Sequence, residues 1–161
     1  MAHVSAPERR VAVIGCGNLA RGDDGVGPHV VRMLAERGLG ERHGVRLLDA
    51  GTDGLAVMHA ARGSDLLILV DASRSGAEPG AVFEVPGSEL ENRAQPALSL
   101  HEFRWDHALF AGRRMYGSGF PKEVTVLLVE AADTGYGLEL SPRVAAAACK
   151  VAERIESLTA P

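Results

Sequence analysis

Aromatic residues are scarce in this chain of 161 residues, at 4% of the sequence, and only two cysteines are present. A core with so few rings has to be built from Val, Leu, Ile and Ala, which suits a parallel or mixed sheet covered by Ala-rich helices. Two cysteines do not make a disulfide framework. Because Cys16 and Cys149 both lie among apolar residues, we expect them to be buried as free thiols in a reducing compartment.

Long apolar runs and an excess of basic residues are also absent. The net charge is −4, with acids and bases interspersed, so we expect no surface for nucleic acid or an anionic membrane. No run approaches the roughly 20 apolar residues that span a bilayer. The polar residues 1–10 lack the apolar segment of a signal peptide. We therefore expect a cytoplasmic protein with one domain over residues 1–161, in which 1–10 form a flexible tail.

Two motifs of common hydrolases are missing as well. The sequence contains no Gly-x-Ser-x-Gly elbow and no His-Glu-x-x-His pair, which argues against a serine hydrolase of that type and against a zincin protease. Cys16 has no activating residue near it in the sequence, so its thiol is a poor candidate for a nucleophile.

What the sequence does contain is a regular alternation of apolar runs and amphipathic segments. Strands are expected at residues 11–14, 45–48, 66–70, 81–85 and 124–129. Helices are expected at residues 28–38, 55–61, 101–113 and 143–158, with Ser99 as a cap for the third. This alternation predicts an α/β fold, a three-layer sandwich with a mostly parallel central sheet flanked by helices. The fourth strand is a candidate for an antiparallel placement, which would make the sheet mixed.

Acidic residues stand where three of these strands end. Asp24 lies in the glycine-rich loop after the first strand, Asp49 follows the second and Asp71 follows the third. Ligands of open α/β sheets bind beyond the carboxyl ends of the strands, so these side chains are expected to converge on one crevice. Neighbouring carboxylates repel each other unless a cation or a shared proton intervenes. The pattern therefore indicates a metal site.

Simpler interpretations exist for each residue taken singly. Asp49 and Asp71 are more often explained as turn caps than as ligands. Asp23 and Asp24 are adjacent in a glycine loop, where an acid pair has no evident packing purpose, although either would favour the positive end of the following helix. His101 opens a helix from which its side chain can reach the crevice, but lone histidines are more often structural.

The same loop also offers an alternative function. Residues Gly15–Ala20 read Gly-x-Gly-x-x-Ala after a strand, which fits a relaxed dinucleotide fingerprint. A doubly wound nucleotide- or small-ligand-binding module is therefore an alternative. Against it, the helix is expected to begin only near Pro28, too late to receive a pyrophosphate. Asp23 and Asp24 would also place negative charge against the phosphates.

Four segments, in order, resemble the motifs of the nickel–iron hydrogenase maturation endopeptidases. They are the opening Gly15–Gly27 (GCGNLARGDDGVG), Leu48–Gly54, similar to Asp-x-Gly-Thr-x-Gly, the strand end Leu67–Ala72, and Ser99–Glu102, similar to Ser-x-His-Glu/Gln. The match covers most of the chain. The opening motif is fairly specific. Each of the other three is weak evidence alone, but together they are strong evidence.

The resemblance implies a nickel site made by Asp24, Asp71 and His101, with Asp49 as a further functional acid. The nickel would be carried by the substrate, a hydrogenase large-subunit precursor, and another divalent cation would replace it in isolation. Imidazole and carboxylates suit Ni²⁺, and three protein ligands leave positions open for the substrate. The implied activity is that of a nickel-dependent, aspartic-type endopeptidase that removes the precursor's C-terminal extension. Asp24 or Asp49 would activate the attacking water.

After His101 the chain departs from the family's pattern of Gly-Leu and an Ala-rich helix. Here Phe103–Phe110 contains bulky and charged side chains, which leaves the identity of the substrate open. Trp105, the only tryptophan, would be an anchor for a partner if exposed, or would fill a gap between helix and sheet if buried. A chaperone that binds the precursor without cutting it is another alternative. We expect a monomer that forms a transient complex.

Overall fold

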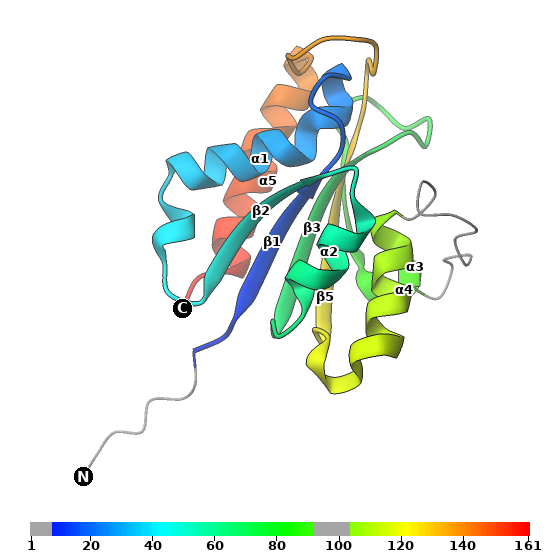
Figure 1. Ribbon diagram of the computed structural model, residues 1–161. Coiled ribbons are helices and arrows are strands. Elements are labelled where there is room, and N and C mark those ends of the chain that lie inside the picture. Colours follow the sequence, from blue (N-terminus) through cyan, green and yellow to red (C-terminus); the bar gives the residue numbers. More distant parts are fainter. Residues whose placement is uncertain (1–7, 92–103) are drawn as a thin grey trace.

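A computed structural model describes residues 8–91 and 104–161 (Figure 1). In these residues five strands form one sheet, β1 (Val11–Cys16), β2 (Val45–Gly51), β3 (Leu66–Ser73), β4 (Val82–Pro86) and β5 (Glu123–Glu130). The strand order is β2-β1-β3-β5-β4. Only β4 is antiparallel to its neighbour β5, and the other pairs are parallel. The expected α/β fold with a mostly parallel, mixed sheet is confirmed.

Helices cover both faces of this sheet (Figure 1). One face carries α1 (Val26–Glu36) and α5 (Pro142–Leu158), and the other carries α2 (Gly54–Ala61), α4 (Trp105–Tyr116) and the short α3 (Gly87–Glu91). Short 3₁₀ turns are η1 (Gly22–Gly25), η2 (Leu39–Glu41) and η4 (Gly117–Gly119). None of the helices in the described residues is long and apolar enough to cross a membrane.

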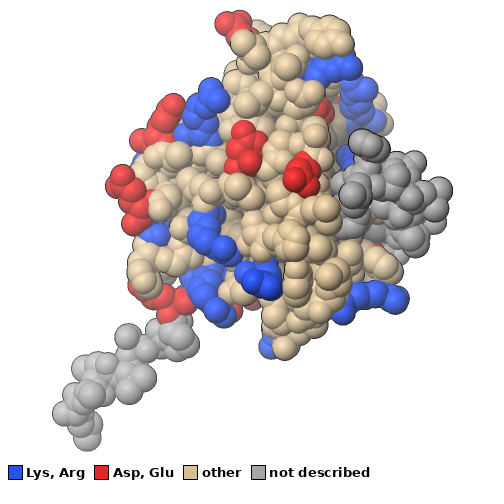
Figure 2. All heavy atoms as spheres, viewed as in Figure 1, with Lys and Arg blue, Asp and Glu red and all other residues tan. Residues whose placement is uncertain are grey.

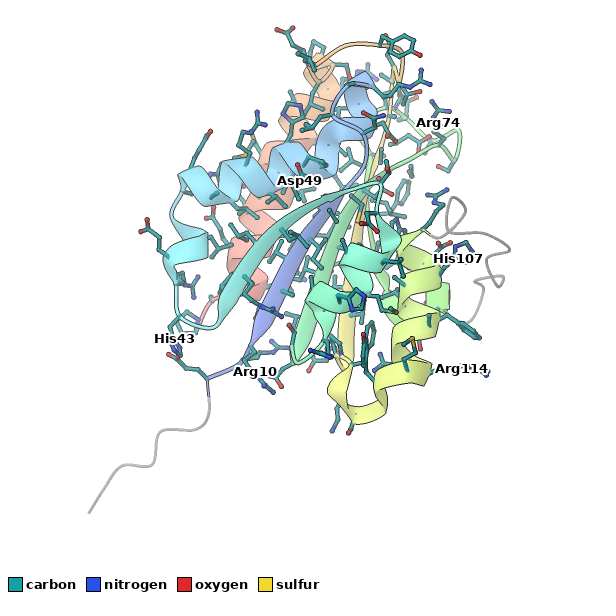
Figure 3. The ribbon with its side chains drawn as sticks, viewed as in Figure 1. Arg10, His43, Asp49, Arg74, His107 and Arg114 are labelled. Atoms are coloured by element: carbon teal, nitrogen blue, oxygen red, sulfur yellow. The ribbon has the colours of Figure 1, made fainter. Side chains whose placement is uncertain are left out.

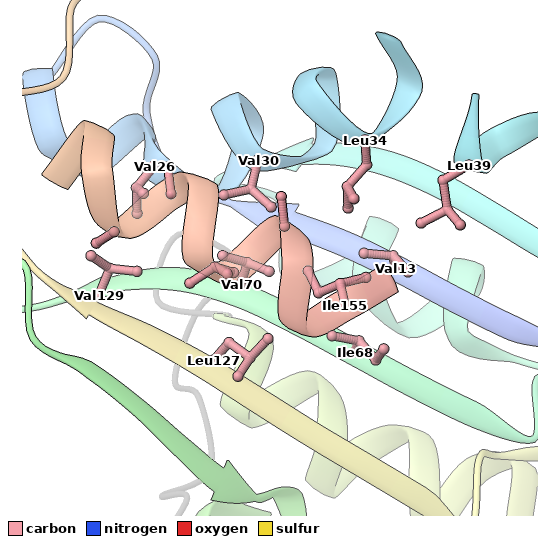
Figure 4. Packing of buried hydrophobic residues seen from close by; sticks show 14 of the residues in the cluster. Val13, Val26, Val30, Leu34, Leu39, Ile68, Val70, Leu127, Val129 and Ile155 are labelled. Atoms are coloured by element: carbon pink, nitrogen blue, oxygen red, sulfur yellow. The ribbon is translucent and has the colours of Figure 1, made fainter. Parts of the chain in front are cut away.

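The central strands are apolar without interruption because both of their faces are buried. On β3, Ile68 and Val70 join the cluster under α1 and α5, whereas Leu67 and Leu69 join the cluster under α2 and α4. Successive side chains of a strand point to opposite faces, so one apolar run supplies both cores. Figure 4 shows the cluster under α1 and α5, in which Ile155 of α5 packs against the sheet.

Three expectations change in detail. The first helix begins at Val26 rather than near Pro28, directly after the turn η1, which the glycine-rich sequence concealed. Cys16 is buried as expected, but Cys149 is exposed, so that prediction is wrong. Its neighbours Ala147 and Ala148 face the core, and the helical repeat then turns Cys149 outward. The third expected helix is α4, which begins at Trp105 rather than near His101, because Arg104 before it is extended, and it ends at Tyr116 rather than near Arg113. The expected cap Ser99 lies outside the described residues.

The surface agrees with the even charge distribution of the sequence. On the face shown in Figure 2, acidic and basic side chains are interspersed over several elements. Many pair with each other at the surface, as Arg154 does with Glu84 at 2.7 Å between Nε and Oε1.

Candidate active site

A cavity of about 1230 Å³ opens at the carboxyl ends of β1, β2 and β3. The chain passes from β1 through α1 to β2, and then through α2 to β3 on the other side of β1. The strand order therefore reverses at β1, with α1 and α2 on opposite faces of the sheet, and such a point in an open sheet is where ligands bind. The residues that line this cavity and matter here are Cys16, Gly17, Asp24, Asp71, Arg104 and Trp105.

Glycines let the opening loop fold tightly against the strand ends. Gly17 has φ +130°, and a Cβ there would lie 1.9 Å from the Asp24 carbonyl oxygen and 3.5 Å from Asp71 Oδ1. A Cβ on Gly27 would lie 2.4 Å from the carbonyl oxygens of both Cys16 and Val70. Any side chain at these positions would clash with backbone. The start of α1 therefore sits on the ends of β1 and β3, which brings Asp24 to the same cavity as Asp71.

Asp24 is partly exposed and belongs to η1. Its Oδ2 accepts a hydrogen bond from the Asn18 backbone N–H at 2.8 Å. Its Oδ1 has no hydrogen-bond partner among the described residues. One oxygen is thus anchored by the loop, which leaves the carboxylate able to accept a cation or a proton on the cavity side.

Asp23 plays a different part from its neighbour, because its side chain is fully buried. Oδ2 accepts from the backbone N–H groups of Ala132 and Asp133 and from the Ser141 hydroxyl, and Oδ1 accepts from the Ser141 N–H at 2.7 Å. Burial raises the pKa of Asp23, but these hydrogen bonds outweigh it and hold the pKa below its usual value. The expectation that this acid pair has no packing purpose is wrong for Asp23.

Asp71 ends the buried part of β3 and is only 7% exposed. Oδ2 accepts from the indole Nε1–H of Trp105 at 2.7 Å, and Oδ1 accepts from the Ala72 N–H at 2.8 Å. The Arg104 guanidinium lies 3.9 Å from Oδ2. Burial raises the pKa of Asp71 to about 6; the two hydrogen bonds and Arg104 oppose this rise, and the charge of Asp24 adds to it. The mutual repulsion that the sequence predicted is therefore present at this pair.

Trp105 has a role at the site that the sequence analysis did not predict. It is 8% exposed and packs in the core under α2 and α4, so its role as an exposed anchor is excluded and its gap-filling role is confirmed. Its hydrogen bond to Asp71 was not expected. The available signal was chemical, because a buried indole N–H needs an acceptor, and Asp71 was the acid expected at the neighbouring strand end.

Asp49 stands apart from this pair. It is exposed at the end of β2 (Figure 3), its Oδ1 accepts from the Gly51 N–H at 2.9 Å, and it is not among the residues that line the cavity. The hydrogen bond is that of a turn cap, the simpler role considered from the sequence. Asp53, four residues later, caps α2 by accepting from Leu55 and Ala56.

Cys16 also lines the cavity, but its thiol is not activated. Burial raises the pKa of Cys16 far above its usual value, and the negative charges of Asp71 and Asp49 raise it further. A thiol in such surroundings stays protonated at neutral pH. Nucleophilic catalysis by Cys16 is therefore disfavoured, as the sequence indicated.

The acid pair fits a divalent cation only in part. Within residues 8–91 and 104–161, no group of three His, Cys, Asp or Glu side chains is placed to hold a metal ion. Asp24 and Asp71 offer two carboxylates, and Asp71 keeps a free lone pair on each oxygen after its two hydrogen bonds. The third expected ligand, His101, lies outside the described residues. Two carboxylates alone are hard oxygen donors that suit Mg²⁺, Ca²⁺ or Mn²⁺, so a borderline cation such as Ni²⁺ would also need a nitrogen donor.

Comparison with known proteins bears on this site. The family model HycI, described as hydrogenase maturation protease, matches residues 28–158. The chain belongs to the hydrogenase maturation protease family. The matched part begins just after the motif that carries Asp24 and includes the positions of Asp49, Asp71 and His101.

Individual members of this family align over most of the chain. The hydrogenase expression/formation protein HupM of Azotobacter chroococcum is 30% identical over 89% of this chain and 72% of its own length. HupD of Thiocapsa roseopersicina is 31% identical over 87% of this chain, which spans 62% of that protein. The hydrogenase-maturating endopeptidase HybD from E. coli superimposes with a TM-score of 0.78 at 25% identity, covering 92% of this chain and 91% of that one.

Proposed function

We propose that this protein is an endopeptidase that removes the C-terminal extension of a hydrogenase large-subunit precursor. The observation that carries the proposal is the meeting of Asp24 and Asp71 in one open cavity, in a chain of the hydrogenase maturation protease family. In this proposal the protein works in the cytoplasm as a monomer and forms a transient complex with the precursor.

Nickel enters as part of the substrate. Asp24, Asp71 and His101 would bind the nickel that the precursor already carries, and so place the bond to be cut over the cavity. A precursor without the metal would lack this attachment. In the free protein another divalent cation would take the same donors.

The chain's own groups differ in how well they suit the chemistry. Asp71 is held by Trp105 and Ala72, so its carboxylate is fixed in direction and suited to binding rather than to moving. Asp24 is partly exposed and lines the cavity, which suits it to accept a proton from an attacking water. Asp49 is the second candidate for that role, and it would have to act from outside the cavity lining.

Incubation with a nickel-loaded large-subunit precursor, followed by intact mass, tests this proposal. We expect wild-type protein to release one C-terminal fragment, whose mass identifies the bond. Asp24→Asn keeps the size of the side chain but removes its charge, and it should abolish the cleavage. Glu78→Gln removes an exposed acid outside the cavity and should cut normally. Cleavage by Asp24→Asn at the wild-type rate would contradict the assignment.

The alternatives give different results in the same experiment. A maturation chaperone would bind the precursor and leave its mass unchanged. A nucleotide-binding module built on Gly15–Ala20 would ignore the precursor and show a rise in melting temperature with a dinucleotide.

A further inference from the structure

The loop between β5 and α5, residues 131–141, carries two large apolar side chains that are almost fully exposed. Tyr136 is 88% exposed and Leu138 is 71% exposed. The loop is orange at the top of Figure 1, at the end of the sheet where β1 and β3 also end. Isolated exposed apolar side chains are common, whereas two of them close together on one loop make a small apolar surface, and exposed apolar surfaces often mark interaction sites.

The backbone of this loop is anchored on both sides of Tyr136. The buried Asp23 carboxylate holds the N–H groups of Ala132, Asp133 and Ser141. Gly137 exchanges hydrogen bonds with the opening loop, from its N–H to Ala20 and from the Gly22 N–H to its carbonyl, at 2.9 and 2.8 Å. The backbone that carries the two apolar side chains is therefore held in place.

The Tyr136 ring is held as well, and the backbone of Leu138 has a further contact. The Arg21 guanidinium carbon lies 4.4 Å from the centre of the Tyr136 ring, within the range of a cation–π contact. The Leu138 carbonyl oxygen lies 3.2 Å from His29 Nε2. An exposed ring that is already ordered loses little freedom when a partner covers it, which favours binding.

This surface is continuous with the active-site cavity. Arg21 and Gly135 line the cavity, and Tyr136 follows Gly135 directly in the sequence. We propose that Arg21, Tyr136 and Leu138 form a docking ridge for the folded body of the substrate protein. The inference rests on the proposed function, because the segment to be cut enters the cavity while still attached to a large folded protein.

The partner of the ridge is a shallow apolar depression on the substrate protein, next to the segment that enters the cavity. Tyr and Arg are the residue types that most often dominate such contacts. A short peptide bound in the cavity would touch only Arg21 of the ridge, whereas the surface of a folded precursor would also cover Tyr136 and Leu138.

Steady-state cleavage of the whole precursor tests the ridge. We expect the double variant Tyr136→Ala and Leu138→Ala to raise KM by roughly tenfold or more, with kcat within twofold of wild type. The single variant Tyr136→Phe keeps the aromatic ring and should have nearly the wild-type KM. Met115→Ala is the matched control, because Met115 is 66% exposed on α4 but does not line the cavity. All four proteins should melt alike, since the changed side chains are exposed.

Binding of the precursor separates failure of the ridge from failure of the proposed function. If wild-type protein does not cut, the proposed function fails, and the dissociation constant for the precursor then tests the ridge alone. The ridge is wrong if the double variant binds and cuts like wild type, or if Met115→Ala weakens binding equally. It is also wrong if native mass shows a wild-type dimer that the double variant separates, because a second copy would then occupy it.

Discussion

The carboxyl groups of Asp23 and Asp24 are neighbours in the sequence, yet their surroundings differ completely. Asp23 accepts four hydrogen bonds in the interior and joins the opening loop to the loop after β5. Asp24 lines the cavity, and its charge raises the pKa of the buried carboxyl of Asp71. At the scale of residues, the site is thus made of one structural acid and two that share a cavity.

The indole of Trp105 gives the first prediction at this scale. Trp105→Phe retains the ring but removes the N–H that donates to Asp71 Oδ2. Because such supporting bonds orient metal-binding carboxylates, we expect the affinity for Ni²⁺ alone, measured by calorimetry, to fall about tenfold or more. Cleavage of a nickel-loaded precursor should fall with it.

Tyr116→Phe is the control for this change. It removes a hydroxyl from the same helix, where Tyr116 contacts His59 at 3.1 Å outside the cavity. Nickel affinity should then stay at the wild-type value. An equal loss in both variants, or no loss in Trp105→Phe, would show that the indole hydrogen bond does not support the site.

At the scale of elements, buried acids fasten the loops at the carboxyl end of the sheet. Glu130 ends β5 and accepts from the hydroxyls of Ser73 and Ser75 and from the N–H groups of Ser75 and Gly76. It thereby ties the end of β3 and its following loop, which carries Arg74 (Figure 3), to β5. The Ser73 hydroxyl and the other donors lower the pKa of Glu130 to about 2, although burial acts in the opposite direction.

A pH dependence of stability follows from this lowered pKa. Because the folded state holds Glu130 ionised, its contribution is complete above the ordinary pKa of 4.5 and disappears as the pH falls towards about 2. Glu130→Gln resembles the protonated acid and should be less stable than wild type at pH 7. The difference in unfolding free energy, measured with urea, should shrink between pH 5 and pH 2. A difference that stays constant over this range would contradict the role of the ionised carboxylate.

The sequence predicted the elements better than their boundaries. The strands were recognisable because β1 and most of β3 are buried on both faces and form apolar runs, and β5 contains the apolar run Val126–Val129. The early start of α1 was hidden, because the turn η1 is built from Gly and Asp, which are typical of loops. The face of Cys149 was hidden for a similar reason, since an Ala-rich helix shows little contrast between its sides.

The location of the site could be predicted from the sequence, but the hydrogen bonds within it could not. Strand order and acids at strand ends placed Asp24 and Asp71 together, and topology alone led to that expectation. The burial of Asp23 and the bond from Trp105 to Asp71 depend on segments more than 30 residues apart in the chain. Local patterns do not contain such pairings.

At the scale of the whole molecule, three features lie together at one end of the sheet. They are the acid pair in the cavity, the anchored loops around it, and the docking ridge at its rim. A protein substrate would be held twice, by its metal in the cavity and by its surface on the ridge. Recognition of the metal is the central claim, because it decides which precursors are cut.

The most direct test compares one large-subunit precursor made in cells grown with nickel and without it. Each form is incubated with wild-type protein and with Asp71→Asn, and the products are measured by intact mass. We expect a released C-terminal fragment only from the nickel-containing precursor and only with the wild-type protein. Equal cleavage of both precursor forms by wild-type protein would contradict metal recognition, because the acid pair would then not distinguish the precursor that carries nickel from the one that lacks it.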